Sequence, residues 1–120
     1  MYILIIFTHL LFANSVEFKS TIEKVEIQSR NEEGRMVTVF TTKDPAKIIE
    51  LKSCLKGKSA PNFKCGYTGK IIYYYSNGEK WSASFNLSSC NHIVYMKGSR
   101  LVSKYLKNES IQLLKKLIKL

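Results

Sequence analysis

Asn77-Gly78 lies between the two aromatic-rich runs "KIIYYYS" and "EKWSASF". An Asn-Gly pair in such a setting is the strongest short-range signal for a β-hairpin with a two-residue turn. With that turn, Tyr74 is expected opposite Trp81, and Ile72 opposite Ala83. This hairpin constrains the fold more than any other feature, because a shift of its register by one residue would exchange its buried and exposed side chains.

The expected register divides the hairpin into two faces, since side chains alternate along a strand. The first face is large and apolar and is expected beneath helices: Ile72, Tyr74, Trp81, Ala83 and Phe85. The second face suits contact with water: Ile71, Tyr73, Tyr75, Lys80, Ser82 and Ser84. Exposed tyrosines supply rigid contact area and are enriched at interfaces. We therefore predict a binding surface of Tyr73, Tyr75, Lys80 and Ser82, although the tyrosines could also serve cross-strand pairing alone.

Two further strands and a helix are expected before this hairpin. Residues 21–30 and 35–42 alternate apolar and polar side chains around the turn "NEEG", which indicates a first hairpin. In the helix that follows, Asp44 is a good N-cap, Pro45 suits the first position and Gly57 suits the end. Its apolar stripe is Ile48, Leu51 and Leu55.

The C-terminal part predicts two short strands and a second helix. A strand "HIVYM" is followed by a turn at 97–99 and an edge strand near 100–106. Asn108 is expected to cap a terminal helix whose apolar side includes Ile111, Leu114 and Ile118 as core residues. A short amphipathic helix of this kind also resembles an interfacial membrane element, but its apolar side is needed to cover the sheet.

The order strand, strand, helix, three or four strands, helix predicts an α+β domain. We expect an antiparallel sheet of about five or six strands with both helices on one face and the other face open.

Residues 1–15 are uncharged and mostly apolar, and Ala13-Asn14-Ser15 has the small-x-small pattern of a cleavage site. An apolar segment of about 7–15 residues before such a site is typical of a secretory signal peptide, and it is shorter than a membrane span. No Lys or Arg precedes the segment. The alternatives are a buried strand or helix, or a start codon chosen late. We predict export, to a periplasm or the extracellular space, of a single domain at 16–120 without a stable membrane anchor.

The chain has three cysteines, Cys54, Cys65 and Cys90. If the hairpin ladder continued outward, Cys65 and Cys90 would lie opposite each other, within bonding reach. An exported chain meets an oxidising environment, so we predict a Cys65–Cys90 disulfide. Cys54–Cys65 and Cys54–Cys90 remain the other possible pairings, and three reduced thiols are expected if the chain is not exported.

Charge is distributed unevenly. Residues 1–50 contain six Lys or Arg and seven Asp or Glu, whereas residues 51–120 contain thirteen and two. The basic part indicates attraction to an anionic partner such as nucleic acid, lipid headgroups, an acidic glycan or an acidic protein. The alternative is that the lysines serve solubility alone.

Catalytic patterns are absent from the sequence. His9 would be removed with a signal peptide, and His92 lies on a strand as an expected surface or edge residue. The cysteines have no zinc-ligand spacing, and no phosphate-binding glycine loop or hydrolase motif occurs. We expect no catalytic residue, metal or cofactor.

Three functions remain. The first is a small exported, non-enzymatic module that binds another protein through the open sheet face, as an inhibitor or immunity protein does. The second is a binder of an anionic polymer, either nucleic acid or an envelope polymer, through the basic C-terminal half. The third is a small secreted hydrolase or nuclease.

Overall fold

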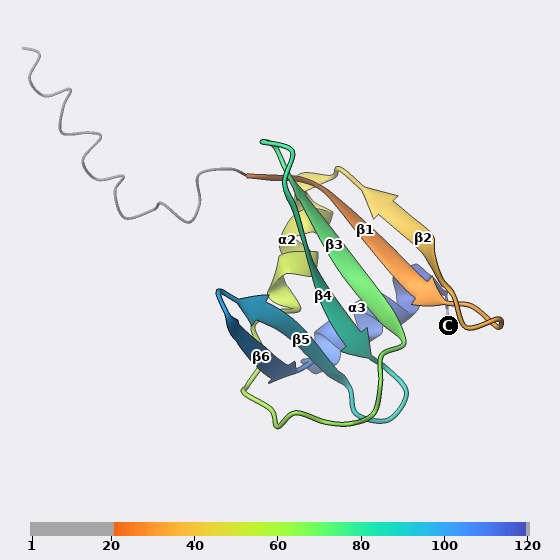
Figure 1. The fold of residues 1–120 in the computed structure, drawn as a ribbon. Coiled ribbons are helices and arrows are strands. Elements are labelled where there is room, and N and C mark those ends of the chain that lie inside the picture. The colour runs from red at the N-terminus through yellow and green to blue at the C-terminus, as the bar shows by residue number, and fades with distance from the viewer. Residues whose placement is uncertain (1–20, 120) are drawn as a thin grey trace, which may run out of the picture.

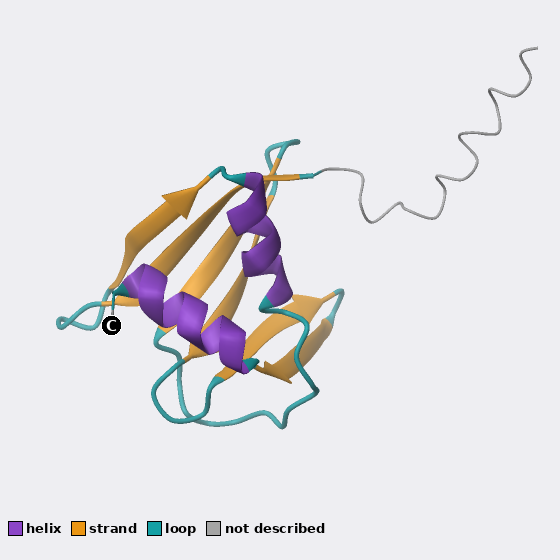
Figure 2. Ribbon diagram, turned by 180° about the vertical axis from the view of Figure 1, so that it is seen from behind, coloured by secondary structure: helices purple, strands orange, loops and turns teal. Residues whose placement is uncertain are grey.

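The computed structural model describes residues 21–119, so the predicted signal peptide at 1–15 lies outside the described residues. Six strands and two helices follow in the order β1 (Ile22–Arg30), β2 (Met36–Thr42), α2 (Pro45–Ser53), β3 (Gly69–Tyr75), β4 (Lys80–Asn86), β5 (His92–Lys97), β6 (Arg100–Tyr105) and α3 (Asn108–Ile118). The strands form one antiparallel sheet in the order β2-β1-β3-β4-β5-β6. Both helices cover the same face of this sheet (Figures 1 and 2). The predicted α+β architecture and element order are confirmed.

The helix α2 begins as its sequence predicts. The Asp44 side chain accepts a hydrogen bond from the backbone N–H of Ala46 at 3.1 Å, and Pro45 is the first helical residue. The helix ends at Ser53, before the predicted end at Gly57. Gly57 has another role, because a Cβ atom there would collide with the carbonyl oxygen of Tyr105. The residue allows the chain to pass against the backbone of β6.

The terminal helix α3 supplies the second cover of the sheet. Leu114 is fully buried, and Ile111 and Ile118 pack partly buried against the core, as predicted. The predicted cap at Asn108 is wrong by one residue, because Lys107 is the N-cap and its side chain makes no capping hydrogen bond.

The core lies between the sheet and the two helices. It is formed by the buried residues Val25, Ile27, Ile48, Leu51, Cys54, Ile71, Tyr73, Ala83, Phe85, Leu87, Ile93, Leu106 and Leu114.

The turn between β3 and β4 has three residues, Ser76 to Gly78. The Tyr75 carbonyl accepts from the N–H of Gly78 at 3.1 Å, and the Tyr75 N–H donates to the carbonyl of Glu79 at 2.9 Å. Gly78 has a φ of 95°, which glycine adopts at little cost. This arrangement matches a three-residue hairpin loop that ends in a left-handed residue. Tyr73 is therefore opposite Trp81, and Ile72 is opposite Ser82.

The longer turn makes the predicted side-chain faces right for β4 and wrong for β3. Trp81, Ala83 and Phe85 lie on the helix-covered side, as expected. The extra turn residue moves β3 by one position relative to β4, and this exchanges its two faces. Ile71 and Tyr73 are consequently in the core.

Tyr73 ties β3 to α2. Its side chain is 0% exposed, and its hydroxyl donates a hydrogen bond to the backbone carbonyl of Leu51 at 2.8 Å. Its ring lies 5.5 Å from that of Trp81, centroid to centroid. Burial raises the pKa of Tyr73 well above its ordinary value, so the hydroxyl remains a donor.

The sheet opens between β4 and the β5–β6 hairpin. β4 and β5 pair through three residues each: Ser84 with Val94, Phe85 with Ile93, and Asn86 with His92. Farther along, the Trp81 indole bridges the gap: its Nε1–H donates to the Met96 carbonyl at 3.4 Å, and its ring meets Tyr95 edge-on. The hairpin tip thus projects from the rest of the sheet (Figure 1).

We predict that Tyr73→Ala lowers the free energy of unfolding by about 3–5 kcal/mol, as for other large aromatics removed from a core. Tyr74→Ala is the matched control and is expected to cost about 1 kcal/mol or less, because that side chain lies on the open face. Urea unfolding followed by circular dichroism measures both values. The opposite ranking would contradict the register described above.

Candidate functional site

The open face of the sheet carries the candidate binding surface. Lys80 and Ser82 are exposed there, as predicted. Tyr73 and Tyr75 are not on this face: Tyr73 is in the core and Tyr75 is half-buried on the helix side. The predicted placement of these two tyrosines is wrong because the turn holds one residue more than expected. Tyr74 takes their position, with Lys70 and Ile72 beside it on β3.

Tyr74 is held in place by neighbours on β1 and β2. Its hydroxyl donates to Glu26 Oε1 at 2.6 Å, and the hydroxyl of Thr38 donates to Glu26 Oε2. The ammonium of Lys24 lies 4.4 Å from the centre of the Tyr74 ring, within the range of a cation–π interaction. These contacts give an accessible aromatic ring one defined orientation.

The same contacts change two pKa values. Hydrogen bonds from Thr38 and Tyr74 lower the pKa of Glu26, so this carboxylate stays ionised. The hydrogen bond to Glu26 raises the pKa of Tyr74, so this phenol stays a donor. Two cations also adjoin Tyr74: Lys24 lies over its ring, and Lys80 is opposite it on β4.

A shallow hollow adjoins Tyr74 on the open face. It has a volume of about 280 Å³, and Lys70, Ile72, Lys80, Trp81 and Ser82 line it. Ile72 is a buried apolar floor between two lysines. An amphipathic surface of this kind suits contact with another protein.

Residues 58–68, here called the strap, cross the β5–β6 end of the open face. The strap first runs beside β6, where Ser59 bridges to Lys104 and the Ala60 N–H donates to the Ser103 carbonyl at 2.9 Å. The Ser103 hydroxyl then donates to the Pro61 carbonyl at 3.0 Å. Phe63 next places its ring against His92 and Tyr105, at centroid distances of 5.0 and 5.9 Å. The open face is therefore uncovered over β1 to β4 and covered near His92.

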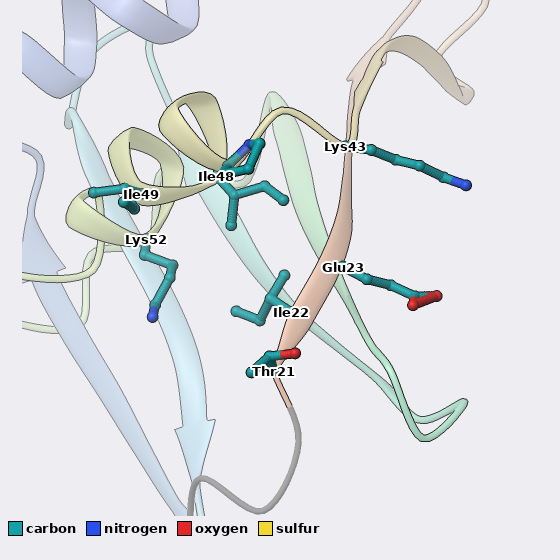
Figure 3. A pocket seen from close by; sticks show the side chains of 8 residues that line it. Thr21, Ile22, Glu23, Lys43, Ile48, Ile49 and Lys52 are labelled. Carbon is teal, nitrogen blue, oxygen red and sulfur yellow. The ribbon is translucent and has the colours of Figure 1, made fainter.

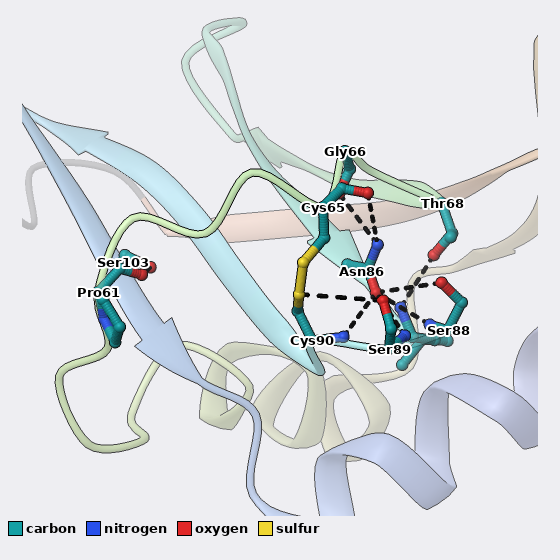
Figure 4. Close-up of a disulfide and its surroundings, with 10 residues drawn as sticks. Pro61, Cys65, Gly66, Thr68, Asn86, Ser88, Ser89, Cys90 and Ser103 are labelled. Carbon is teal, nitrogen blue, oxygen red and sulfur yellow. Dashed lines mark hydrogen bonds between the residues drawn. A yellow bond between two sulfur atoms is a disulfide. The ribbon is translucent and has the colours of Figure 1, made fainter.

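A disulfide joins the end of the strap to the loop after β4. Cys65 and Cys90 are paired, with their Cα atoms 6.4 Å apart (Figure 4). The predicted pair is the one observed, but the two loops bring it together and not a continued ladder, because β3 begins at Gly69 and β4 ends at Asn86. Cys54 is buried, and burial raises its thiol pKa. A raised thiol pKa disfavours the reactive thiolate.

Asn86 organises both loops around the disulfide. Its side chain is 1% exposed, and its Nδ2 donates to the carbonyls of Cys65 and Gly66 at 3.3 and 3.0 Å. Its Oδ1 accepts from the N–H groups of Ser88, Ser89 and Cys90 at 3.0 to 3.2 Å. One amide thereby satisfies five backbone groups that no strand pairs (Figure 4).

His92 is buried under the strap, so its predicted surface or edge position is wrong. The ring is 0% exposed and lies between Phe63 and Tyr67. Neither ring nitrogen has a hydrogen-bond partner within the described part of the chain. Burial lowers the pKa of His92, which favours the neutral ring. A buried ring without an orienting partner is poorly placed to act as a general base.

A second pocket lies between the start of β1 and the first turns of α2 (Figure 3). Its volume is about 460 Å³. Ile22 and Ile48 point toward one another, whereas Glu23 and Lys43 extend away from the helix. Ile49 and Lys52 complete the side along α2. The pocket has an apolar floor and brings no pair of nucleophile and base together.

We predict that stability falls as the pH is lowered, through His92. Its folded pKa is lowered, so below about pH 6.5 the unfolded chain takes up a proton that the folded chain resists. The free energy of unfolding should be constant above that pH and decrease from there down to the folded pKa. Urea unfolding at pH 7.5, 6.5 and 5.5 measures this slope.

The control is His92→Phe, which keeps an aromatic ring against Phe63 but cannot titrate. This variant should lose most of the slope between pH 6.5 and 5.5. A flat profile for the unaltered protein, or an equal slope in both proteins, would contradict the assignment. Glu26 contributes separately at lower pH, because its lowered pKa adds stability that is lost as the carboxylate is protonated.

Comparison of the chain with protein-family models, with characterised proteins and with solved structures finds no match. Between residues 21 and 119, no helix is long and apolar enough to span a membrane. The same residues contain no group of three or more His, Cys, Asp and Glu side chains arranged to hold a metal ion.

Proposed function

We propose that this chain is an exported, non-enzymatic module that binds another protein through the open face of its sheet. The supporting observation is Tyr74, an accessible tyrosine that Glu26 and Lys24 hold in one orientation. An aromatic side chain that is ordered before binding loses little entropy in a complex. Tyrosines of this kind often carry much of the binding energy of an interface.

The charges around Tyr74 indicate the chemistry of the partner. Lys24 lies over its ring, and Lys80 is opposite it on β4. Glu26 is already engaged by Tyr74 and Thr38. The face therefore suits a partner with an acidic patch, because complementary charge speeds association and selects among partners. Inhibitor-like and immunity-like proteins act by such binding without catalysis.

Export is part of the same proposal. The Cys65–Cys90 disulfide holds the strap against the sheet of this small domain. Disulfides of this kind form and persist in oxidising compartments. The apolar segment at 1–15, read as a signal peptide, supports the same location.

Two other functions receive less support. A hydrolase would need a base, and His92, the histidine among residues 21–119, is buried without a partner. An anionic envelope polymer would suit the lysines but makes no use of the ordering of Tyr74. A nucleic acid could stack a base on that ring, but its phosphates would then lie near the Glu26 carboxylate. Retention on heparin that depends on Lys70 and Lys80, without any protein partner, would favour the polymer.

We predict that Tyr74→Ala and Lys80→Glu each weaken the protein complex at least tenfold. The first removes an ordered anchor, and the second places a carboxylate against an acidic partner. Affinity capture from the culture medium and envelope identifies the partner, and surface plasmon resonance with the purified partner gives the dissociation constants.

The matched controls are Tyr67→Ala, on the strap, and Lys116→Glu, on α3. Both remove the same residue types from other surfaces and should leave the affinity within about twofold, since contacts outside an interface contribute little. Full affinity in the Tyr74 and Lys80 variants would show that binding occurs elsewhere on the molecule.

A further inference from the structure

Two kinds of side chain occupy opposite faces of the β5–β6 hairpin tip. A two-residue turn at Gly98 and Ser99 joins the strands, and Gly98 has a φ of 67°. Met96 is opposite Leu101, and Lys97 is opposite Arg100. Since side chains alternate along a strand, the apolar pair faces one side and the cationic pair faces the other.

The cationic side is unusual because like charges face each other without compensation. Lys97 and Arg100 are exposed cross-strand neighbours, an arrangement that destabilises a sheet. Lys104 lies on the same side of β6 as Arg100. Within residues 21–119, the single ion pair joins Lys47 to Glu50, so no carboxylate there neutralises these three cations. A local conflict that the fold leaves uncompensated is expected at a functional site.

The three cations line one hollow beside β6. Its volume is about 340 Å³, and its polar lining includes Ser59 and Ser103 as well as Lys97, Arg100 and Lys104. The lining contains three cations and no carboxylate, and the Ser103 hydroxyl already donates to the Pro61 carbonyl. Such a site favours a phosphate group, which accepts charge-assisted hydrogen bonds from lysine and arginine side chains.

The other side of the tip is apolar and accessible. Met96 is 46% exposed and Leu101 is 49% exposed, and the two are direct cross-strand neighbours. The tip projects away from the body of the sheet, because β4 and β5 separate beyond Val94 (Figure 1). A flat surface can therefore meet the tip without touching the rest of the open face.

We propose that the β5–β6 hairpin tip binds the surface of an anionic lipid bilayer. Met96 and Leu101 enter the boundary between headgroups and acyl chains, and Lys97, Arg100 and Lys104 contact lipid phosphates. This combination of apolar insertion and basic contacts is how peripheral elements bind anionic membranes reversibly. A soluble polyanion would use the cations but would gain nothing from two exposed aliphatic side chains. The interaction is independent of the protein partner proposed for Tyr74.

Binding is measured with the disulfide-bonded chain by co-sedimentation with vesicles of equal parts phosphatidylglycerol and phosphatidylcholine, and with vesicles of phosphatidylcholine alone. The chain has a single tryptophan, and Trp81 contacts the backbone of Met96. Quenching of its fluorescence by brominated phosphatidylcholine, mixed into the same vesicles, therefore reports on the tip itself. This readout separates tip binding from any membrane binding by residues 1–15.

The test variants are Lys97→Gln with Arg100→Gln, and Met96→Ser with Leu101→Ser. The matched control is Lys115→Gln with Lys116→Gln, which lowers the net charge equally on α3. Each basic residue at an anionic surface contributes about a fivefold factor in affinity, so the first variant should bind about 25-fold more weakly. The second should bind at least tenfold more weakly, and the control should quench like the unaltered protein. Each variant is first shown to have the same urea unfolding midpoint as the unaltered protein.

Three results would overturn the proposal. The first is equal quenching in the tip variants and the unaltered protein. The second is equal binding to anionic and neutral vesicles. The third is heparin retention that depends on Lys97 and Arg100 without any vesicle binding, which would identify a soluble polyanion as the ligand.

Discussion

The turn Ser76 to Gly78 determines which residues of this protein lie in its core and which face solvent. Gly78 in a left-handed conformation closes a three-residue loop, and that loop sets Tyr73 opposite Trp81. Tyr73 then reaches the Leu51 carbonyl, and Tyr74 reaches Glu26. Burial of the first tyrosine fastens α2 to the sheet, and exposure of the second creates the candidate binding surface. A slip of one residue in this turn would remove both contacts.

A second constraint acts at the other end of the sheet. The strap, the Cys65–Cys90 disulfide and the Asn86 amide hold one loop over His92. This cover makes His92 inaccessible, and burial lowers its pKa, which favours the neutral ring. The open face stays uncovered over β1 to β4 and again at the β5–β6 tip, where Met96 and Leu101 are exposed. The strap therefore bounds the candidate binding surface on one side, and the β5–β6 hairpin projects beyond the strap. The two proposed ligands, a protein and a lipid surface, meet separate parts of the molecule.

Local rules predicted most elements of this fold. Asp44-Pro45 marks a helix start because an N-cap acceptor and a residue without an N–H suit that position, and the structure agrees. The length of the turn between β3 and β4 does not follow from these rules, because Asn-Gly fits both a two-residue and a three-residue turn. One additional turn residue moves every β3 side chain to the other face of the sheet. Burial of His92 was not predictable from alternation, since the covering Phe63 lies far away in sequence. The exposure of Tyr74 was not predicted because the expected turn was one residue too short, although its neighbours Lys80 and Ser82 were placed correctly.

The register of β3 and β4 in solution is the most direct test of this account. Tyr75 and Glu79 form a hydrogen-bonded pair, so alternation along the ladder makes Tyr74–Lys80 and Ile72–Ser82 non-hydrogen-bonded pairs, whose Hα atoms lie closest. Nuclear Overhauser effects between Hα atoms should therefore join Tyr74 to Lys80 and Ile72 to Ser82. Effects that join Tyr75 to Lys80 and Tyr73 to Ser82 would show the two-residue turn and would contradict the assignment of both tyrosines.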